Sequence, residues 1–256
     1  NSFNKYIQDS RIAVETVRGG IVPHAGWFFS GRLAALVFQV CAAQANPDVV
    51  VLFGGHLGSG TGIIYADKIW ETPLGALEVD QDLTAALMKK VNLRPEGPRT
   101  NDNTVEVQVP LVKYYFPTSR LVAARAPHSS QAIEIGEELA GLSRNQGKSI
   151  LAFGSTDLTH YGPNYGFQYR GHGPTALSWV KEVNDRGFIQ RALALDYQGM
   201  LDHAAANHSA CSAGGAVAAA AVCGALGAIG GTLADYYTSY DIMPDDSFVG
   251  YAGIVY

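Results

Sequence analysis

Histidines follow three apolar runs of strand type, each at the point where a strand would end. His24 follows IVP, His56 follows VVVLFGG, and His128 follows LVAARAP. A fourth run, SILAFGST, is followed closely by Asp157 and His160. In open α/β sheets, ligands bind in the crevice outside the carboxyl ends of the strands. Imidazoles and a carboxylate at one such edge are suited to binding a metal ion or to moving protons.

Cys211 is the cysteine best placed for chemistry, because it precedes SAGGAVAAAAV, a run typical of a tightly packed helix. The dipole and free N–H groups of a helix N-terminus favour a thiolate. A thiolate ligand would make metal binding release a proton and weaken as the pH falls. Alternatively, His208 could serve Cys211 as a base. Cys223, inside the apolar run, is expected to be a packing residue.

Asp157 and His160 lie three residues apart in STDLTHYG. This spacing puts both side chains on one side of a turn or of a first helical turn. It favours acid/base work by His160 assisted by Asp157. A serine triad with Ser155 is disfavoured, because residues so close in sequence do not easily line up in series. Glu106, in NDNTVEVQVP, is expected to start a helix and is a further candidate for the site.

Composition excludes several classes of function. The chain has 256 residues, of which 47% are apolar and 16% charged, and a formal net charge of −5. These values are typical of a globular protein, and the charge offers no basic surface for nucleic acid or for a membrane. We therefore expect a small-molecule substrate, with protein partners left open.

Cysteine usage and the first residues bear on the compartment. Three cysteines without a framework spacing favour a reducing compartment. The opening NSFNKYIQDS lacks an apolar signal core, so a cytoplasmic location is expected. The Ala- and Gly-rich stretch 211–229 lacks flanking charges and aromatic anchors, which predicts a core helix and no membrane span.

Apolar runs alternate with helical patterns along the whole chain. Continuous runs such as VVVLF and SILAF are typical of strands covered on both faces. Strands separated by helices predict one α/β domain over residues 1–256, with a mostly parallel central sheet flanked by helices and an antiparallel part from the last two strands. The expected strands are 20–22, 49–53, 121–124, 149–153, 232–240 and 248–256. The expected helices are 32–45, 82–91 capped by Asp80, 105–115, 131–143, 176–194 and 214–228.

Six ordered blocks resemble those of the Memo-like family, called AmmeMemoRadiSam system protein B in bacteria and archaea. They are PHAGWFFSG, the second strand with GGH, ETPLGALEVD, NTVEVQVPLVKYYFP, STDLTHYG and the terminal YAGIVY. The resemblance runs from about residue 20 to the end, with the N-terminal segment of the family expected to be shortened. That family is similar in fold to the class III extradiol dioxygenases, which hold Fe(II) with two histidines and a glutamate.

The resemblance implies a site. Its metal ligands fall on His24, His56 and Cys211, and its acid/base histidine falls on His160. Asp157 and Glu106 match further polar positions that line the pocket of the family. Three places depart from the usual blocks. Gly54-Gly55 stands where the family has Pro followed by Ser or Asn, and Ser212 stands where Gly commonly follows the cysteine. The segment APHS around His128 stands where an apolar run is expected.

The function implied is that of a metal-dependent, dioxygenase-like oxidoreductase acting on a small aromatic or enolic substrate. Two imidazoles and a thiolate leave coordination positions open, as a catalytic site requires. One transition-metal ion is expected, with Fe(II) favoured and copper or zinc as alternatives. A binding module without turnover and a metal-dependent hydrolase are the other hypotheses. The role of His128 is open.

Overall fold

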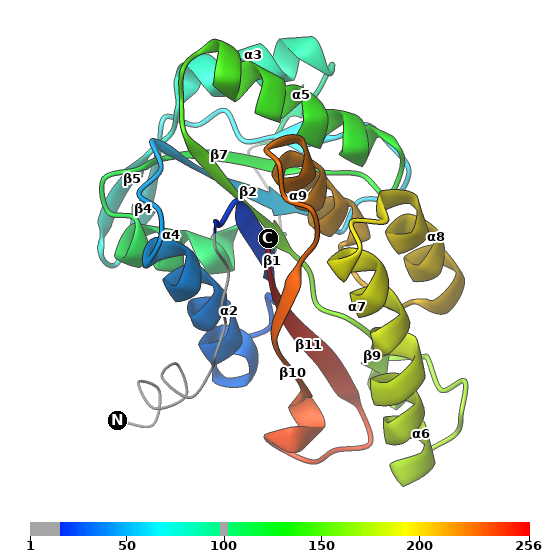
Figure 1. Cartoon of the computed structure of the whole chain (residues 1–256). Coiled ribbons are helices and arrows are strands. Elements are labelled where there is room, and N and C mark those ends of the chain that lie inside the picture. The colour runs from blue at the N-terminus through cyan, green and yellow to red at the C-terminus, as the bar shows by residue number, and fades with distance from the viewer. Residues whose placement is uncertain (1–15, 98–101) are drawn as a thin grey trace.

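A twisted sheet forms the centre of the molecule in this computed structural model, which describes residues 16–97 and 102–256 (Figure 1). The expected shortening of the N-terminal segment concerns residues outside that part. Four parallel strands lie side by side at the centre of the sheet. In spatial order they are β1 (Gly19–Val22), β8 (Ile150–Ser155), β2 (Val49–Gly54) and β7 (Arg120–Arg125).

Antiparallel pairs flank this parallel centre. On the β1 side these are β11 (Phe248–Val255), β10 (Thr232–Thr238) and the short β9 (His160–Tyr161). On the β7 side, β3 (Ile63–Ile64) runs antiparallel to β7 and pairs with β6 (Arg94–Pro95). The α/β class, the parallel central strands and the antiparallel contribution of the last two strands are confirmed.

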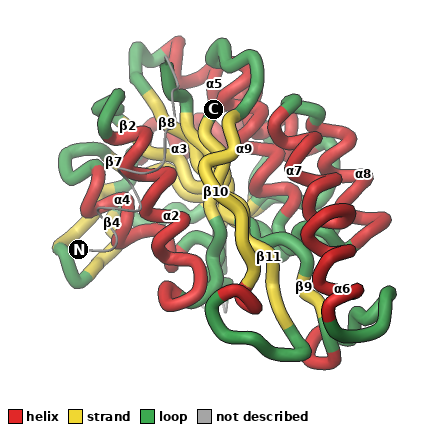
Figure 2. The backbone as a smooth tube through the Cα atoms, turned by 60° about the horizontal axis from the view of Figure 1, so that its bottom comes forward, coloured by secondary structure: helices red, strands yellow, loops and turns green. Residues whose placement is uncertain are grey.

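Helices cover both faces of the sheet, and alternate residues of β2 enter different cores. Val51 and Phe53 pack in one core, while Val50 and Leu52 pack in the other. This double burial explains why the strand is a continuous apolar run. Figure 2 shows the strands between α2 and α4 on one side and α7, α8 and α9 on the other. The helices are α2 (Trp27–Ala42), α3 (Gln81–Lys90), α4 (Val109–Tyr115), α5 (Gln131–Asn145), α6 (Pro174–Trp179), α7 (Asp185–Leu193), α8 (Tyr197–Asn207) and α9 (Ala213–Ala225).

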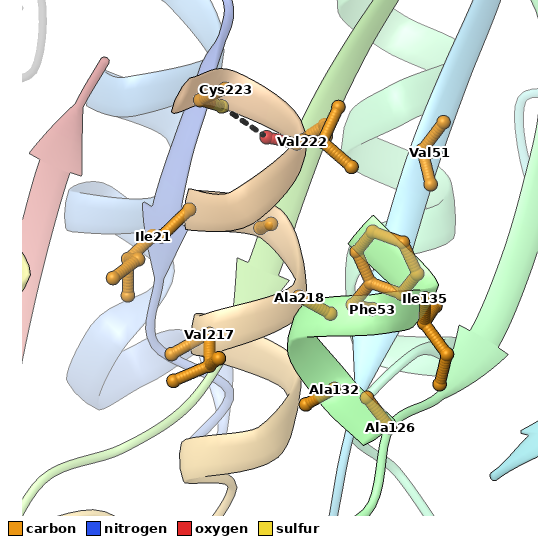
Figure 3. Packing of buried hydrophobic residues seen from close by; sticks show 14 of the residues in the cluster. Ile21, Val51, Phe53, Ala126, Ala132, Ile135, Val217, Ala218, Val222 and Cys223 are labelled. Carbon is orange, nitrogen blue, oxygen red and sulfur yellow. Dashed lines mark hydrogen bonds between the residues drawn. The ribbon is translucent and has the colours of Figure 1, made fainter. Parts of the chain in front are cut away.

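The Ala-rich segment forms the buried helix α9, as expected. Its small side chains let α5 approach closely, and a Cβ on Gly136 of α5 would lie only 2.4 Å from the carbonyl oxygen of Ala218. Ile135 and Phe53 pack around this contact (Figure 3). Such close packing makes the interior sensitive to added volume. Across residues 16–97 and 102–256, the helices are too short or too polar to cross a membrane.

Three expected helices differ from the structure. The helix expected over 32–45 begins five residues earlier, at Trp27, and ends at Ala42. The prediction of one helix over 176–194 is wrong, because a π-helical turn (Val180–Asn184) separates α6 from α7. The expected helix 105–115 begins as a 3₁₀ turn (Glu106–Gln108) and becomes α-helical only at α4. The π turn brings two buried polar side chains, Asn184 and Asp185, to the site loops described below, and π turns of this kind occur frequently at functional sites.

Helix α8 and a hairpin of β4 (Ile69–Thr72) and β5 (Gly75–Glu78) were not predicted, and neither were the two-residue strands β3, β6 and β9. The hairpin sequence has mostly exposed or half-exposed residues, so it lacks the apolar run by which the other strands were found. The expected N-cap of α3 is confirmed, because the Asp80 carboxylate accepts a hydrogen bond from the Leu83 N–H at 2.9 Å.

Candidate metal site

Three loops bring His24, His56 and Cys211 together. His24 follows β1, His56 follows β2, and Cys211 lies two residues before α9. One ligand atom from each residue lies within 4.8 Å of those of the other two. The Cys211 Sγ is 3.2 Å from the His24 Nε2, and the two imidazole rings meet edge to face at 5.1 Å. Ligands of one ion sit about 2.0–2.3 Å from it. Small side-chain shifts would therefore let the three residues hold a metal ion.

The other nitrogen of each imidazole has a partner. The His24 Nδ1 is 3.2 Å from the Ser155 hydroxyl at the end of β8. The His56 Nδ1 is 3.1 Å from the carboxylate of Asp102. Such contacts fix the orientation of ligating histidines and are a usual feature of metal sites. Asp102 was missed from the sequence, although it lies in the block NDNTVEVQVP from which Glu106 was selected.

Arg125, at the end of strand β7, contacts the carboxylate of Asp102. Its guanidinium lies 3.4 Å from Asp102 and 3.4 Å from Glu96, and its Nε donates to the carbonyl of Gly55 at 2.9 Å. Arg125 therefore holds both the residue before His56 and the carboxylate that orients the His56 ring. From the sequence, the only indication that Arg125 supports the site was its position as a charged residue at the end of an apolar strand.

Charge is concentrated at the three ligand candidates. Burial by itself would raise the pKa of the Cys211 thiol, but the imidazoles of His24 and His56 outweigh it and hold that pKa well below its ordinary value. Burial by itself would lower the pKa of His24. The negative charges of Cys211 and Asp157 outweigh burial and raise the pKa of His24 to about 9. The hydrogen bond to Asp102, followed by that to Cys211, raises the pKa of His56 to about 10. The metal-free site therefore favours a thiolate at Cys211 and imidazolium rings at His24 and His56.

A cavity of ≈ 470 Å³ opens onto both imidazoles, and it contains Asp157 and His160. The buried Asp157 carboxylate accepts the backbone N–H of His24 at 2.7 Å, and burial raises its pKa. The His160 Nδ1 is 3.1 Å from the Leu158 carbonyl, and the Tyr165 ring meets the imidazole edge to face at 4.9 Å. Asp157 lies in a loop and His160 in β9, so the two residues do not share the turn or first helical turn that their spacing suggested.

Buried polar groups at the π turn join two loops of the site. Asp185 accepts the backbone N–H of Thr159, the residue before His160, at 3.0 Å. The Asn184 amide donates to the Thr159 hydroxyl and to the carbonyl of Asn207, both at 2.9 Å. Asn207 begins the segment that leads to the cysteine. The loop with the histidine and the loop with the thiol are thereby fixed to one another.

The other histidine and carboxylate candidates lie apart from the three ligand candidates. Glu106 is exposed and lines a neighbouring cavity that also reaches His24. The His128 Nε2 lies 2.8 Å from the Leu201 carbonyl, and His128 does not belong to the cluster of ligand atoms. The His208 ring contacts Phe167, and no hydrogen bond to Cys211 is recorded among the described residues. The geometry therefore gives no support to a Cys211–His208 nucleophile pair.

Comparison with known proteins identifies the family of the chain. The profile of the family described as "Memo-like protein" matches residues 1–255. The chain belongs to the Memo-like family. MEMO1 family proteins of Methanopyrus kandleri and Pyrococcus furiosus are 34% and 31% identical to it; the matches cover 94% and 93% of this chain and 83% and 86% of theirs. An uncharacterized protein from Escherichia coli K12 shares the fold with a TM-score of 0.54 and 14% identity, over 86% of this chain and 91% of that one.

Two of the departures from the usual Memo-like blocks lie against each other. A Cβ on Gly55 would fall 2.4 Å from the Cβ of Ser212 and 2.6 Å from its hydroxyl. The space that a side chain would need at position 55 is therefore filled from position 212.

Proposed function

We propose that this protein is a metal-dependent oxidoreductase that acts on a small aromatic or enolic molecule, with His24, His56 and Cys211 as ligands of one transition-metal ion. The observation that carries the proposal is the meeting of two oriented imidazoles and a thiolate beside a cavity that holds a candidate proton carrier. Catalytic metal sites keep a coordination position free for substrate, and three protein ligands leave room for one.

Fe(II) is the metal that we favour, with copper or zinc as alternatives. Two imidazoles with one further anionic ligand and open positions are typical of Fe(II) oxygenases, whereas a thiolate also suits zinc and copper. When bound, the ion would supply Lewis acidity and, for iron or copper, electron transfer to or from the substrate. A reducing, cytoplasmic setting belongs to the proposal, because three cysteines without a framework spacing favour one.

His160 is proposed to carry protons between the substrate and the protein. A carbonyl oxygen can only accept a hydrogen bond, so the Leu158 carbonyl assigns the proton of the neutral ring to Nδ1. The Nε2 is then free to act as a base. Asp157 fixes the loop of His24 by accepting its backbone N–H and adds negative charge beside the imidazoles. Glu106 is assigned a place at the edge of the substrate pocket.

The test compares His160→Gln with His172→Gln, a change at an exposed histidine. Protein loaded anaerobically with Fe(II) is mixed with catechols and with enolic acids, and O₂ uptake is followed. We expect His160→Gln to retain about one metal ion per chain and to lose at least 100-fold in turnover. His172→Gln should behave as wild type. Metal binding without any O₂ uptake would favour the binding module, and ester hydrolysis by the zinc form would favour the hydrolase.

A further inference from the structure

The neighbouring cavity that Glu106 lines has a volume of ≈ 450 Å³ and includes neither His160 nor Cys211. We call it the tryptophan cavity, because the indole rings of Trp27 and Trp70 belong to its wall. The wall comes from the start of α2, from β4 with the turn after it, and from the segment that leads into α4. Figure 1 shows the hairpin of β4 and β5 beside α4. This hairpin contributes no ligand candidate to the metal site, so its place in a cavity calls for a separate explanation.

Both indole rings of the tryptophan cavity are held in place by neighbouring residues. The Trp27 Nε1 donates a hydrogen bond to the Val107 carbonyl at 3.1 Å, which joins the start of α2 to the segment that carries Glu106. The Trp70 ring meets the ring of Tyr65 edge to face at 5.2 Å. Trp27 is nevertheless 52% exposed, and Trp70 is partly exposed. Rings that are fixed before a ligand arrives lose little conformational freedom when it binds.

The acidic side chains of the tryptophan cavity are those of Glu71 and Glu106, and no lysine or arginine of the described residues lines it. Both glutamates are exposed, and neither carboxylate has a recorded ion pair or hydrogen bond within residues 16–97 and 102–256. The buried His24 also reaches this cavity, but the negative charges of Cys211 and Asp157 beside it offset its positive charge. The two carboxylates are therefore available to a cation from outside.

A guanidinium group matches both features of this cavity. It is planar and stacks on aromatic faces, and indole is the ring that attracts cations most strongly. Its N–H groups also form a fork that pairs with a carboxylate by two parallel hydrogen bonds. The volume of the cavity lies within the range of about 300–1,000 Å³ that is typical of small-molecule sites.

We propose that the tryptophan cavity binds a guanidinium group, which lies against an indole ring and donates hydrogen bonds to Glu71 or Glu106. The carboxylates and rings that make this site are outside the metal cluster, and none of them requires a bound metal. The site therefore stands independently of the proposed oxidoreductase function.

Two matched pairs of variants test the carboxylate and the ring. Glu71→Gln removes a carboxylate of the cavity, while Glu78→Gln makes the same change on the other strand of the hairpin, outside the cavity. Trp27→Leu removes an indole ring, while Phe28→Leu removes the exposed neighbouring ring, which does not line the cavity. Each variant is first checked for an unchanged melting temperature. Either pair suffices by itself if a member of the other fails to fold.

The protein is titrated by calorimetry with N-acetyl-arginine amide and with N-acetyl-citrulline amide, which carries a neutral urea of nearly the same shape. We expect wild type, Glu78→Gln and Phe28→Leu to bind the arginine compound equally. Glu71→Gln and Trp27→Leu should bind it at least fivefold more weakly, and wild type should bind the citrulline compound at least fivefold more weakly. Equal binding of the two compounds, equal binding of the arginine compound to all five proteins, or no binding to wild type would each overturn the assignment.

Two further arms identify the source of the guanidinium group and separate this site from the metal. Ethylguanidine has no amide groups, so affinity equal to that of the arginine compound would indicate a free guanidino compound. Tighter binding of the arginine compound would indicate an arginine side chain of another protein. All titrations are run with chelator and again with bound zinc, and guanidinium binding that needs the metal would overturn its independence. Absence of O₂ uptake with guanidinium binding intact would count only against the proposed function.

Discussion

The carboxylate of Asp102 lies 3.1 Å from the Nδ1 of His56 and orients the ring of this candidate metal ligand. The Asp102 side chain is nearly buried, whereas that of His56 is 39% exposed. Much of the orientation of His56 therefore depends on this contact rather than on surrounding packing. The interaction is equivalent to the carboxylate–histidine–metal arrangement found in many metal sites.

Asp102→Asn should weaken metal binding by about 10- to 100-fold, because the amide no longer stabilises the orientation and basicity of the ring. Competition with a chromophoric chelator measures the affinity. Glu96→Gln is the matched control, since Glu96 also lies 3.4 Å from Arg125 but is not a recorded partner of His56. An equal loss in both variants would show that the arginine network, and not the contact with the histidine, determines affinity.

Metal binding should strengthen as the pH rises from 7 to 9. The pKa values of His24 and His56 are raised to about 9 and about 10, so both rings are protonated at pH 7 and must lose protons to become ligands. The imidazoles hold the pKa of Cys211 well below its ordinary value, which shifts the release of protons on metal binding toward the two histidines. The binding constant should therefore rise by roughly two log units per pH unit below about pH 9. Calorimetry in buffers of different ionisation enthalpy counts the released protons; a count of zero at pH 7.5 would contradict these pKa shifts.

Alkylation by iodoacetamide in metal-free protein should be fastest at Cys211. Its thiolate is half-buried and favoured at neutral pH, whereas burial raises the pKa of the thiols of Cys41 and Cys223. Added metal should protect Cys211 at least tenfold, because a ligating thiolate is no longer a free nucleophile. Mass spectrometry of labelled peptides gives the rate at each cysteine. Labelling that metal does not slow would remove Cys211 from the ligand set.

Gly55→Ser should destabilise the protein by about 1–3 kcal/mol, because the new side chain overlaps that of Ser212. The double variant Gly55→Ser with Ser212→Gly should recover most of that loss, since the exchanged residues fill the same space. Urea unfolding of the two single variants and the double variant gives the coupling energy. Additive effects of the two changes would mean that the contact does not restrict these positions.

Asp185 should make the protein less stable as the pH rises from about 4 to 7. Burial raises its pKa to about 7, so the folded protein holds this proton through a range in which the unfolded chain has lost it. The contribution of Asp185 to the free energy of unfolding is complete below about pH 4, the pKa of an aspartate in the unfolded chain. It is lost as the pH rises through the pKa of Asp185 in the folded protein, and the loss is on the order of a few kcal/mol. Asp185→Asn should therefore gain stability relative to wild type over this range. The exposed Asp202→Asn is the control, and a pH-independent difference for Asp185→Asn would exclude the shift.

The sequence by itself determined the class of fold and the positions of most of the candidate site. Apolar runs such as 49–53 are readable because both faces of the strand are buried, a local consequence of composition. Residues just beyond such runs necessarily reach the carboxyl edge of a parallel sheet. His24, His56 and His160 were found in this way, and Cys211 was found by its place before a helix of small residues.

Only the tertiary structure decided which of those residues meet and what holds them. His128 and Glu106 were candidates from their sequence positions, as His56 was, but they lie apart from the three ligand candidates in the structure. The strand order decides which loops meet: β8 lies between β1 and β2, and this brings the loop of Asp157 against that of His24. Asp102 and His56 are 46 residues apart in the sequence, so patterns of local spacing could not predict their contact. The π turn before Asp185 and the contact of Gly55 with Ser212 likewise arise from packing between distant segments, which local sequence patterns do not encode.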